Sequence, residues 1–231
     1  MTREIVLDTE TTGLSPRDGH RIVEIGAVEL INHMPSGQSF HVYLDPQRDM
    51  PKEAEAVHGL SAEFLKGKPL FGSVADEFLA FIGDSIMVIH NASFDMTFIN
   101  SELKSVGKSA IAMSQVIDTL AVAKQKFPMA SNSLDALCKR FGIDLSRRTK
   151  HGALLDSELL AEVYLELIGG RQTALGLATP ATVKRASQTV SQSIARSRPT
   201  ILPARLTEME RAAHAALVFE LGDKSLWPKP E

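Results

Sequence analysis

The hydrophobic pattern of residues 5–44 is typical of β-strands. An apolar run begins at Ile5, β-branched residues are frequent from 21 to 31, and a third apolar stretch covers 40–44. The Pro-Ser-Gly sequence at 35–37 predicts the turn between the last two strands. Because short connections join these stretches, we expect a three-strand meander.

From residue 51 the apolar spacing becomes helical and is interrupted by two further apolar strands. Pro51 suits a first helical turn and Gly59 suits a helix end, which predicts a helix over 51–58. The unbroken apolar run at 86–90 predicts a strand covered on both faces, and Ser93 is expected to cap the next helix. The fold class is therefore α/β, with a mixed central sheet flanked by helices. The other predicted elements are a strand at 116–118, helices at 73–82, 93–107, 120–126 and 133–141, and a last helical element that starts within 150–156 and continues to 169–170, with His151 on the loop before it.

The composition changes after residue 170. The chain up to that point carries 16 Lys+Arg and 23 Asp+Glu, whereas the remainder carries 9 and 5, with no acid between 171 and 207. We expect one globular domain over 1–170, a flexible linker over 171–203 and a C-terminal helical segment over 204–231. A short amphipathic helix cannot bury its own apolar stripe, so this segment is predicted to bind a partner; the alternative is that it folds back on the domain. The stripe consists of Leu206, Met209, Ala213, Leu217 and Leu221, and the single tryptophan, Trp227, follows it.

Cysteine usage and hydropathy indicate the compartment. The one cysteine, Cys138, excludes an intrachain disulfide, and no apolar run approaches membrane-spanning length. We therefore expect a cytoplasmic protein that does not associate with a membrane.

Two carboxylates at the end of the first strand suggest chemistry. Asp8 and Glu10 project to the same side of a strand, and two anions a few Å apart repel unless a proton or a cation lies between them. A divalent metal is the usual cation. Taken alone, the pair is better explained as two solvated acids beside a turn, because short motifs match by chance. Asp95 alone is explained by its favourable position in a first helical turn, and Asp156 by a capping role.

Three motifs that occur in a fixed order indicate the function more specifically than any one of them alone. They are Asp8-x-Glu10-Thr-Thr-Gly, His90-Asn91-x-x-Phe94-Asp95 and His151-x-Ala153-x-x-Asp156. Together they resemble the DnaQ-like (DEDD) 3′–5′ exonucleases, in the subgroup whose third motif contains histidine (DEDDh). The resemblance covers about residues 4–168 and implies a ribonuclease H-like exonuclease fold.

The resemblance also implies roles for individual residues. Asp8, Glu10, Asp95 and Asp156 would bind two Mg²⁺ or Mn²⁺ ions, and His151 would accept the proton of the attacking water. The terminal nucleotide would contact the backbone after Glu10, with Phe94 alternatively serving only as core packing and Glu53 as a solvated helix residue. The implied substrate residues are Thr11, Thr12, Glu53, His58 and Phe94.

The tail resembles that of the proofreading (epsilon) subunits of bacterial DNA polymerase III. Gln172-x-x-Leu175-x-Leu177 is similar to the peptide that docks on the sliding clamp, although it ends in leucine rather than phenylalanine. The layout implies that 204–231, with Trp227, binds the polymerase alpha subunit; binding of a small accessory subunit is left open. The implied function is metal-dependent removal of mismatched 3′ nucleotides from DNA during replication. Two alternatives are a stand-alone exonuclease acting on RNA ends or short oligonucleotides, and a non-catalytic adaptor between clamp and polymerase.

Overall fold

The computed structural model describes residues 2–146, 148, 150–170 and 207–221. The chain divides into two units, residues 1–177 and 178–231, and each is described by itself. The whole predicted linker (171–203), including the predicted clamp peptide with Gln172, Leu175 and Leu177, lies outside the described residues, and so does Trp227.

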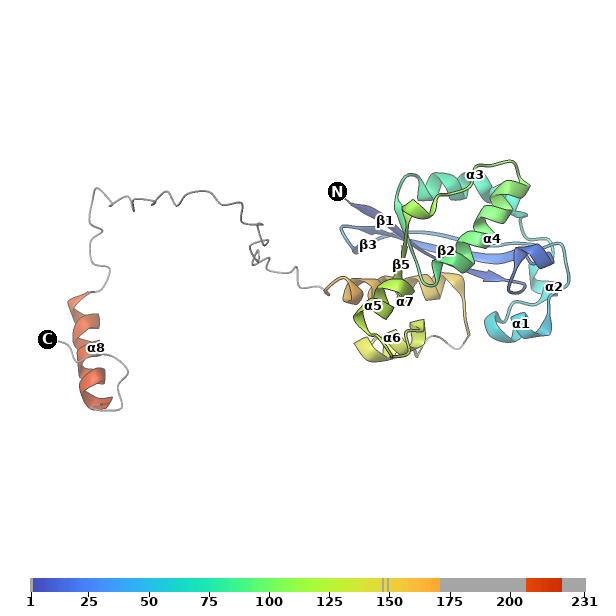
Figure 1. Ribbon diagram of the computed structural model, residues 1–231. Helices are drawn as coiled ribbons and strands as arrows, with labels where there is room; N and C mark the ends of the chain where they lie inside the picture. Colours follow the sequence, from blue (N-terminus) through green and yellow to red (C-terminus); the bar gives the residue numbers. More distant parts are fainter. Residues whose placement is uncertain (1, 147, 149, 171–206, 222–231) are drawn as a thin grey trace, which may run out of the picture. The chain divides into compact units, whose positions relative to one another are not determined.

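The first unit is built on a five-stranded mixed sheet with the strand order β3-β2-β1-β4-β5 (Figure 1). The first three strands pair antiparallel, which confirms the predicted meander, and β4 and β5 join beside β1 as parallel strands. The strands are β1 (Arg3–Thr11), β2 (Ile22–Ile31), β3 (Met34–Tyr43), β4 (Ile86–Ile89) and β5 (Val116–Asp118).

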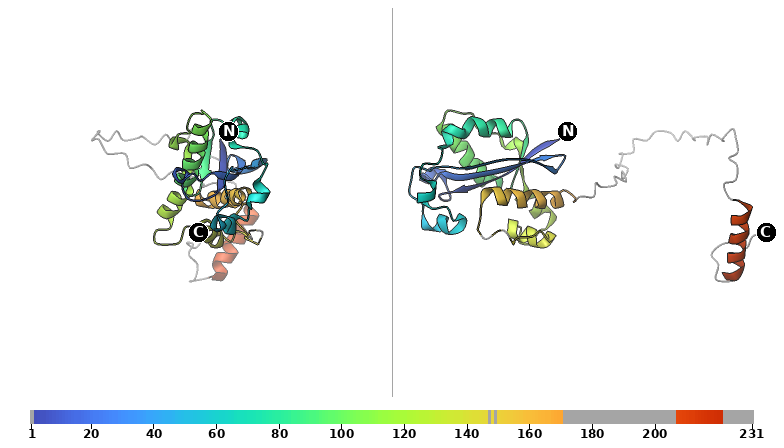
Figure 2. Two further views of the ribbon diagram at one scale, coloured as in Figure 1. Left: turned by 90° about the vertical axis from the view of Figure 1, so that its right-hand side faces the viewer. Right: turned by 180° about the vertical axis from the view of Figure 1, so that it is seen from behind.

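Helices cover both faces of this sheet (Figures 1 and 2). Ile5 and Leu7 of β1 pack with α3 and α4 in one apolar cluster, whereas Val6, which points the other way, packs with α7. The helices are α1 (Lys52–His58), α2 (Ala62–Leu65), α3 (Phe71–Ile82), α4 (Ala92–Ser105), α5 (Thr119–Lys126), α6 (Leu134–Phe141), α7 (Ala153–Leu167) and α8 (Glu208–Leu221), with 3₁₀ turns η1 (Pro16–Asp18) and η2 (Met113–Gln115). No described helix has the length and apolar content needed to cross a membrane.

The predicted turn at 35–37 is wrong. The β2–β3 hairpin turns at Asn32 and His33, both of which have positive φ (51° and 66°), and 35–37 lies inside β3. Two consecutive left-handed residues turn the chain with the same hand as the twist of the strands, so a two-residue hairpin forms here without glycine. Gly37 (φ 88°) instead lies near the register shift of this strand pair, which falls between Val28 and Leu30.

Two predicted helix starts also differ from the structure. Ser93 lies inside α4, because Asn91 takes the preceding cap position in a left-handed conformation (φ 64°). Helix α3 begins at Phe71 rather than Ser73, and α2 was not predicted at all. The early start of α3 buries Phe71 in the core, which outweighs the capping preference of a serine. The predicted helix in the C-terminal segment is present as α8.

Candidate active site

Strand β2 and the first turn of α7 approach each other closely at Gly26. A Cβ atom at Gly26 would lie only 2.1 Å from the backbone nitrogen of Leu154, so the absence of a side chain permits this approach. The hydroxyl of Ser157 donates to the Gly26 carbonyl at 2.9 Å and fixes the contact. Asp8 is paired with Gly26 across the ladder, so Asp156 of α7 is brought to the same face of the sheet as Asp8.

Asp95 reaches the site from the other flanking layer. It lies in the first turn of α4 and is 3% exposed. Its Oδ1 accepts hydrogen bonds from the backbone nitrogen of Thr9 at 3.1 Å and from the Thr9 hydroxyl at 2.6 Å. These bonds tie the start of α4 to β1, between the two strand carboxylates.

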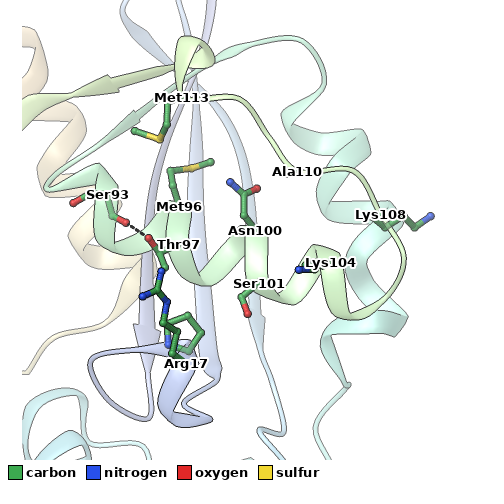
Figure 3. A pocket seen from close by; sticks show the side chains of 11 residues that line it. Arg17, Ser93, Met96, Thr97, Asn100, Ser101, Lys104, Lys108, Ala110 and Met113 are labelled. Atoms are coloured by element: carbon green, nitrogen blue, oxygen red, sulfur yellow. Dashed lines mark hydrogen bonds between the residues drawn. The ribbon is translucent and has the colours of Figure 1, made fainter.

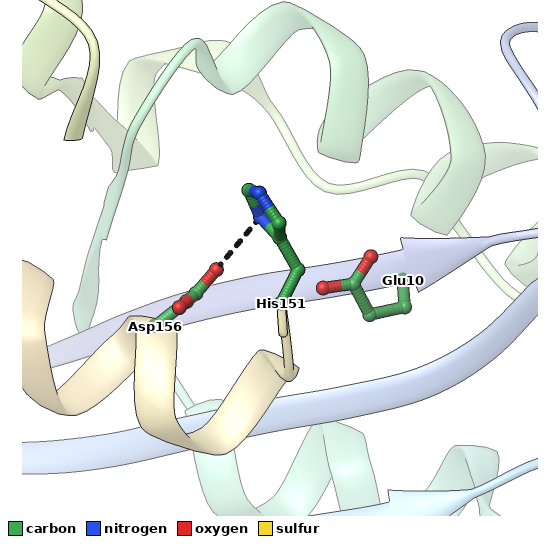
Figure 4. A group of neighbouring side chains, drawn as sticks. All are labelled: Glu10, His151 and Asp156. Atoms are coloured by element: carbon green, nitrogen blue, oxygen red, sulfur yellow. Dashed lines mark ion pairs between the residues drawn. The ribbon is translucent and has the colours of Figure 1, made fainter. Parts of the chain in front are cut away.

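The third motif surrounds the carboxylate of Asp156. His151 lies on the loop before α7 and Asp156 in its first turn, as the sequence predicted, and His151 Nδ1 is 3.2 Å from Asp156 Oδ2. Potential ligand atoms of Glu10, His151 and Asp156 all lie within 4.8 Å of one another. Figure 4 shows the imidazole of His151 between the two carboxylates. A backbone bond from His151 to the Val57 carbonyl (3.3 Å) also links this loop to α1.

An arginine completes the described surroundings of Asp156. Arg148 Nε and Nη2 donate to the two oxygens of Asp156 at 2.5 and 2.6 Å. The same Nη2 lies 2.8 Å from His151 Nδ1, and Nη1 pairs with Asp135 of α6. The Arg148 side chain is only 7% exposed.

The carboxyl groups differ sharply in their acidity. Burial, followed by repulsion from Asp95 and Glu10, raises the pKa of Asp8 well above its ordinary value. Burial also raises the pKa of Glu10 to about 8 and that of Asp95 to about 7. For Asp156, burial acts in the same direction, but hydrogen bonds from Arg148 and His151 prevail and hold its pKa below the ordinary value. The hydrogen bond to Asp156 raises the pKa of His151.

This set of groups fits a divalent metal site. Several buried carboxyl groups resist ionisation because they repel one another, and a hard cation among them would reverse that effect. The donor atoms are carboxylate oxygens with one imidazole, which suits Mg²⁺ or Mn²⁺.

A pocket of about 650 Å³ contains all five predicted catalytic residues, together with Phe94. A larger pocket of about 720 Å³ follows the outer side of α4 (Figure 3). Its lining includes the cations Arg17, Lys104 and Lys108 but none of the described carboxylates, so its residues offer no carboxylate ligand for a divalent ion. The smaller pocket is therefore the candidate active site. Its lining comprises Asp8, Thr9, Glu10, Leu14, His90, Asn91, Phe94, Asp95, Leu120, Ser133, Leu134, Arg148, His151 and Asp156.

The predicted substrate residues fall into two groups. Phe94 is half-buried in the pocket wall, with its ring 5.1 Å from that of Phe98, so it is both accessible and part of the core. The hydroxyl of Thr11 donates to the Gly13 carbonyl, and Thr12 is fully buried. Their hydroxyl groups therefore do not face the pocket as free donors, and the Thr12 nitrogen is itself bonded to the Arg21 carbonyl at 2.9 Å.

The other two predicted substrate residues lie on α1. Glu53 is exposed, whereas His58 is 6% exposed and accepts a hydrogen bond from the Leu60 nitrogen at its Nδ1. Burial lowers the pKa of His58, and the nearby Thr11 carbonyl acts in the opposite direction. Its Nε2 is the one buried side-chain nitrogen or oxygen without a hydrogen-bond partner among the described residues.

Sequence reasoning missed three residues that shape this site: Thr9, Gly26 and Arg148. An isolated glycine inside a strand pattern signals a close backbone approach, so Gly26 was open to prediction. Thr9 and Arg148 carry no such signal, because their roles depend on elements distant in sequence.

Comparison with known proteins identifies the family. The family model described as "Exonuclease" matches residues 5–164. The DNA polymerase III subunit epsilon of Rickettsia felis is 58% identical over 175 residues, covering 74% of this chain and 76% of that protein. The corresponding subunit of Escherichia coli K12 is 46% identical over 238 residues and covers 98% of both chains.

Solved structures agree at the level of the fold. The nuclease domain of 3′hExo, described as a DEDDh family member bound to rAMP, gives a TM-score of 0.63 at 17% identity, covering 72% of this chain and 91% of that one. Exonuclease X in complex with 5′ overhanging duplex DNA gives 0.55 at 23% identity, covering 71% and 90%. The chain belongs to the exonuclease family and, within it, to the epsilon subunits of bacterial DNA polymerase III.

Proposed function

We propose that this proofreading exonuclease hydrolyses the 3′-terminal phosphodiester bond of DNA and releases 5′-mononucleotides. The observation that carries the proposal is the convergence of Asp8, Glu10, Asp95 and Asp156 from β1, α4 and α7 on one pocket that also contains His151. Two bound Mg²⁺ or Mn²⁺ ions would lower the pKa of a water molecule and stabilise charge on the phosphate and the leaving 3′ oxygen. The four carboxylates are the residues that would hold these ions.

His151 is the proposed general base. Its position on a loop, half-exposed and beside Glu10 and Asp156, allows it to meet a water molecule in the pocket. A hydrogen bond from Nδ1 to Asp156 would orient the ring and leave Nε2 to take the proton. The carboxylate then stabilises the imidazolium that forms.

The residues around the pocket would position the terminal nucleotide. Phe94 offers a ring on which any base can stack, and such stacking is tolerant of sequence. The unpaired Nε2 of His58 can donate to a phosphate or sugar oxygen. The backbone of Thr11 and the exposed carboxylate of Glu53 complete the proposed contacts, whereas Thr12 is buried behind them and would support the Thr11 backbone.

The C-terminal segment is proposed to hold the enzyme on its polymerase. Helix α8 exposes Met209 (81%), Leu217 (50%) and Phe219 (88%), which is a large apolar area for a single helix. We assign it, with Trp227, to the polymerase III alpha subunit, and residues 172–177 to the sliding clamp. In this setting the protein works in the cytoplasm, and tethering compensates for the weak electrostatic attraction of residues 1–170 to DNA, because Asp and Glu outnumber Lys and Arg there by 23 to 16.

The test is digestion of a primer with a mismatched 3′ end by the purified protein, with Mg²⁺, with Mn²⁺ and with EDTA. Asp95→Asn should abolish release of mononucleotides, because it removes a proposed metal ligand. Asp84→Asn is the matched control, since Asp84 is an exposed acid outside the pocket.

RNA oligomers of the same sequence are digested in parallel. Preference for RNA would favour a stand-alone role at RNA ends, and the absence of metal-dependent turnover on either substrate would favour the adaptor. Binding of the alpha subunit by the full chain, lost when Phe219→Asp is introduced, tests the tail separately.

A further inference from the structure

The guanidinium of Arg148 occupies the place at Asp156 where a cation is required. It engages both carboxylate oxygens, through Nε at 2.5 Å and Nη2 at 2.6 Å. Asp156 is 3% exposed and the Arg148 side chain 7%, so little water screens this pair. A planar fork of this kind matches a carboxylate better than a single point charge does.

This arrangement sets the arginine against a metal ion. A divalent ion needs an oxygen of Asp156 at close range, and both oxygens already accept short bonds from the guanidinium. Two nearby positive charges also repel each other in a poorly hydrated pocket. Full bidentate pairing with Arg148 and tight metal binding at Asp156 therefore oppose each other.

The contact of Arg148 with His151 also opposes the arrangement that catalysis would require. Arg148 Nη2 lies 2.8 Å from His151 Nδ1 and can donate only if that nitrogen carries no proton. The hydrogen bond from Nδ1 to Asp156, at 3.2 Å, needs a proton on the same nitrogen. The two contacts exclude each other, so the imidazole can orient on Asp156 only when the arginine withdraws.

Asp135 provides an anchor for the withdrawn arginine. It pairs with Nη1, which takes no part in the bonds to Asp156, and its side chain is 51% exposed on α6. The guanidinium can thus leave Asp156 without losing its second carboxylate partner.

We propose that Arg148 is a built-in counter-ion of the metal site, which stabilises Asp156 in the metal-free protein and competes with the divalent ion for this carboxylate. The proposal rests on the metal-dependent function given above. Arg148 acts through Asp156 and His151 and is a positioning residue.

The test measures Mn²⁺ binding by titration calorimetry, without DNA, for the full-length wild type and for Arg148→Gln, Arg148→Lys and Lys139→Gln. Lys139→Gln is the matched control, because it removes a positive charge from the exposed side of α6. Arg148→Gln should bind Mn²⁺ about tenfold more tightly than the wild type, equivalent to about 1.4 kcal/mol. Arg148→Lys keeps the charge but loses the fork, so its affinity should lie between the two. Lys139→Gln should match the wild type.

Thermal unfolding in EDTA tests the second half of the proposal, that Arg148 stabilises the metal-free protein. Arg148→Gln should unfold at a lower temperature than the wild type in EDTA, because Asp156 loses its partner, and should recover most of the difference with Mn²⁺. A purely structural arginine would lower both stability and metal affinity, and that result would overturn the proposal. Arg148→Lys binding no more tightly than the wild type would overturn it too, and keeps the test valid if Arg148→Gln does not fold in EDTA. If the wild type binds no Mn²⁺ at all, the metal-dependent function itself fails.

Discussion

Replacing Gly26 by alanine should disable the enzyme without touching any proposed catalytic group. A Cβ at this position would lie 2.1 Å from the Leu154 nitrogen and 2.2 Å from the Ala153 carbonyl carbon. Ordinary van der Waals contact begins at 3.4 Å, so the first turn of α7 must retreat by about 1.3 Å. Both atoms belong to backbone, which leaves no flexible side chain to absorb the clash.

The expected cost can be estimated from two contributions. Overpacking of a well-packed interior costs about 1–3 kcal/mol. The hydrogen bond from Ser157 to the Gly26 carbonyl, fully buried at 2.9 Å, adds about 1 kcal/mol when lost. A total of about 2–4 kcal/mol lowers the unfolding temperature by roughly 5–15 °C for a domain of this size. Activity should fall by about a hundredfold, because Asp156 moves with the helix and a 1 Å displacement of a reacting group has that effect.

The assay is release of mononucleotides from a labelled primer at 20 °C, with folding checked by circular dichroism. Gly37→Ala is the control, since nothing lies within 4 Å of a Cβ there and only the positive φ of 88° is strained. It should lose about 1 kcal/mol of stability and keep its activity. A folded Gly26→Ala protein that stays within threefold of the wild-type rate would refute the reasoning.

Four further outcomes follow from the pocket and its supports. Burial raises the pKa of Glu10 to about 8 and that of Asp95 to about 7, so protons compete with the metal for these carboxylates. The affinity for Mn²⁺ should therefore increase from about pH 6 to 8.5, and calorimetry in two buffers would detect the protons released on binding. An affinity that does not change with pH would contradict this. The metal-free fold then holds more protons than the unfolded chain between about pH 4.5 and 8, so its stability in EDTA should decrease as pH rises through that window. Arg21→Ala removes the bidentate partner of Glu102, which is 4% exposed, and should lower the free energy of unfolding in urea by about 2 kcal/mol. This value is smaller than for a fully buried pair, because the arginine side chain is 39% exposed. A loss below about 0.5 kcal/mol would show that Glu102 has other partners. Thr9→Val deletes the 2.6 Å hydroxyl bond to Asp95 and should lower kcat about tenfold with little change in KM, whereas an unchanged kcat would mean that the backbone bond alone orients the carboxylate.

The sequence predicted those parts of the fold that depend on local pattern. Strands β1 and β4 lie where their apolar runs predicted them, because buried strands require apolar residues. Helix α1 ends at Gly59 as predicted, because the left-handed conformation at a helix end favours glycine. The hairpin turn was misplaced because His33 follows Asn32 where glycine usually completes the turn signal, and because the misleading Pro-Ser-Gly follows soon after. Turn chemistry at such positions is decided by the pairing of the strands.

The candidate site was predicted as a set of residues, and its arrangement was not. The order of the three motifs predicted that Asp8, Asp95 and Asp156 belong to one site. It could not show that burial raises the pKa of Asp8, whereas the hydrogen bonds from Arg148 lower the pKa of Asp156. Those differences depend on depth and on neighbours from other elements. Contacts between residues distant in sequence leave no periodic pattern, so the sequence alone does not predict them.

The position of Asp156 on α7 has a consequence for biosynthesis. Among the described residues of the first unit, α7 is the last element in chain order, and all five strands of the sheet to which it docks are translated before it. A growing polypeptide that has placed β1 and α4 therefore lacks one of its four acids until this helix leaves the ribosome. The proposed hydrolytic centre is therefore assembled only after the sheet and α4 have been translated.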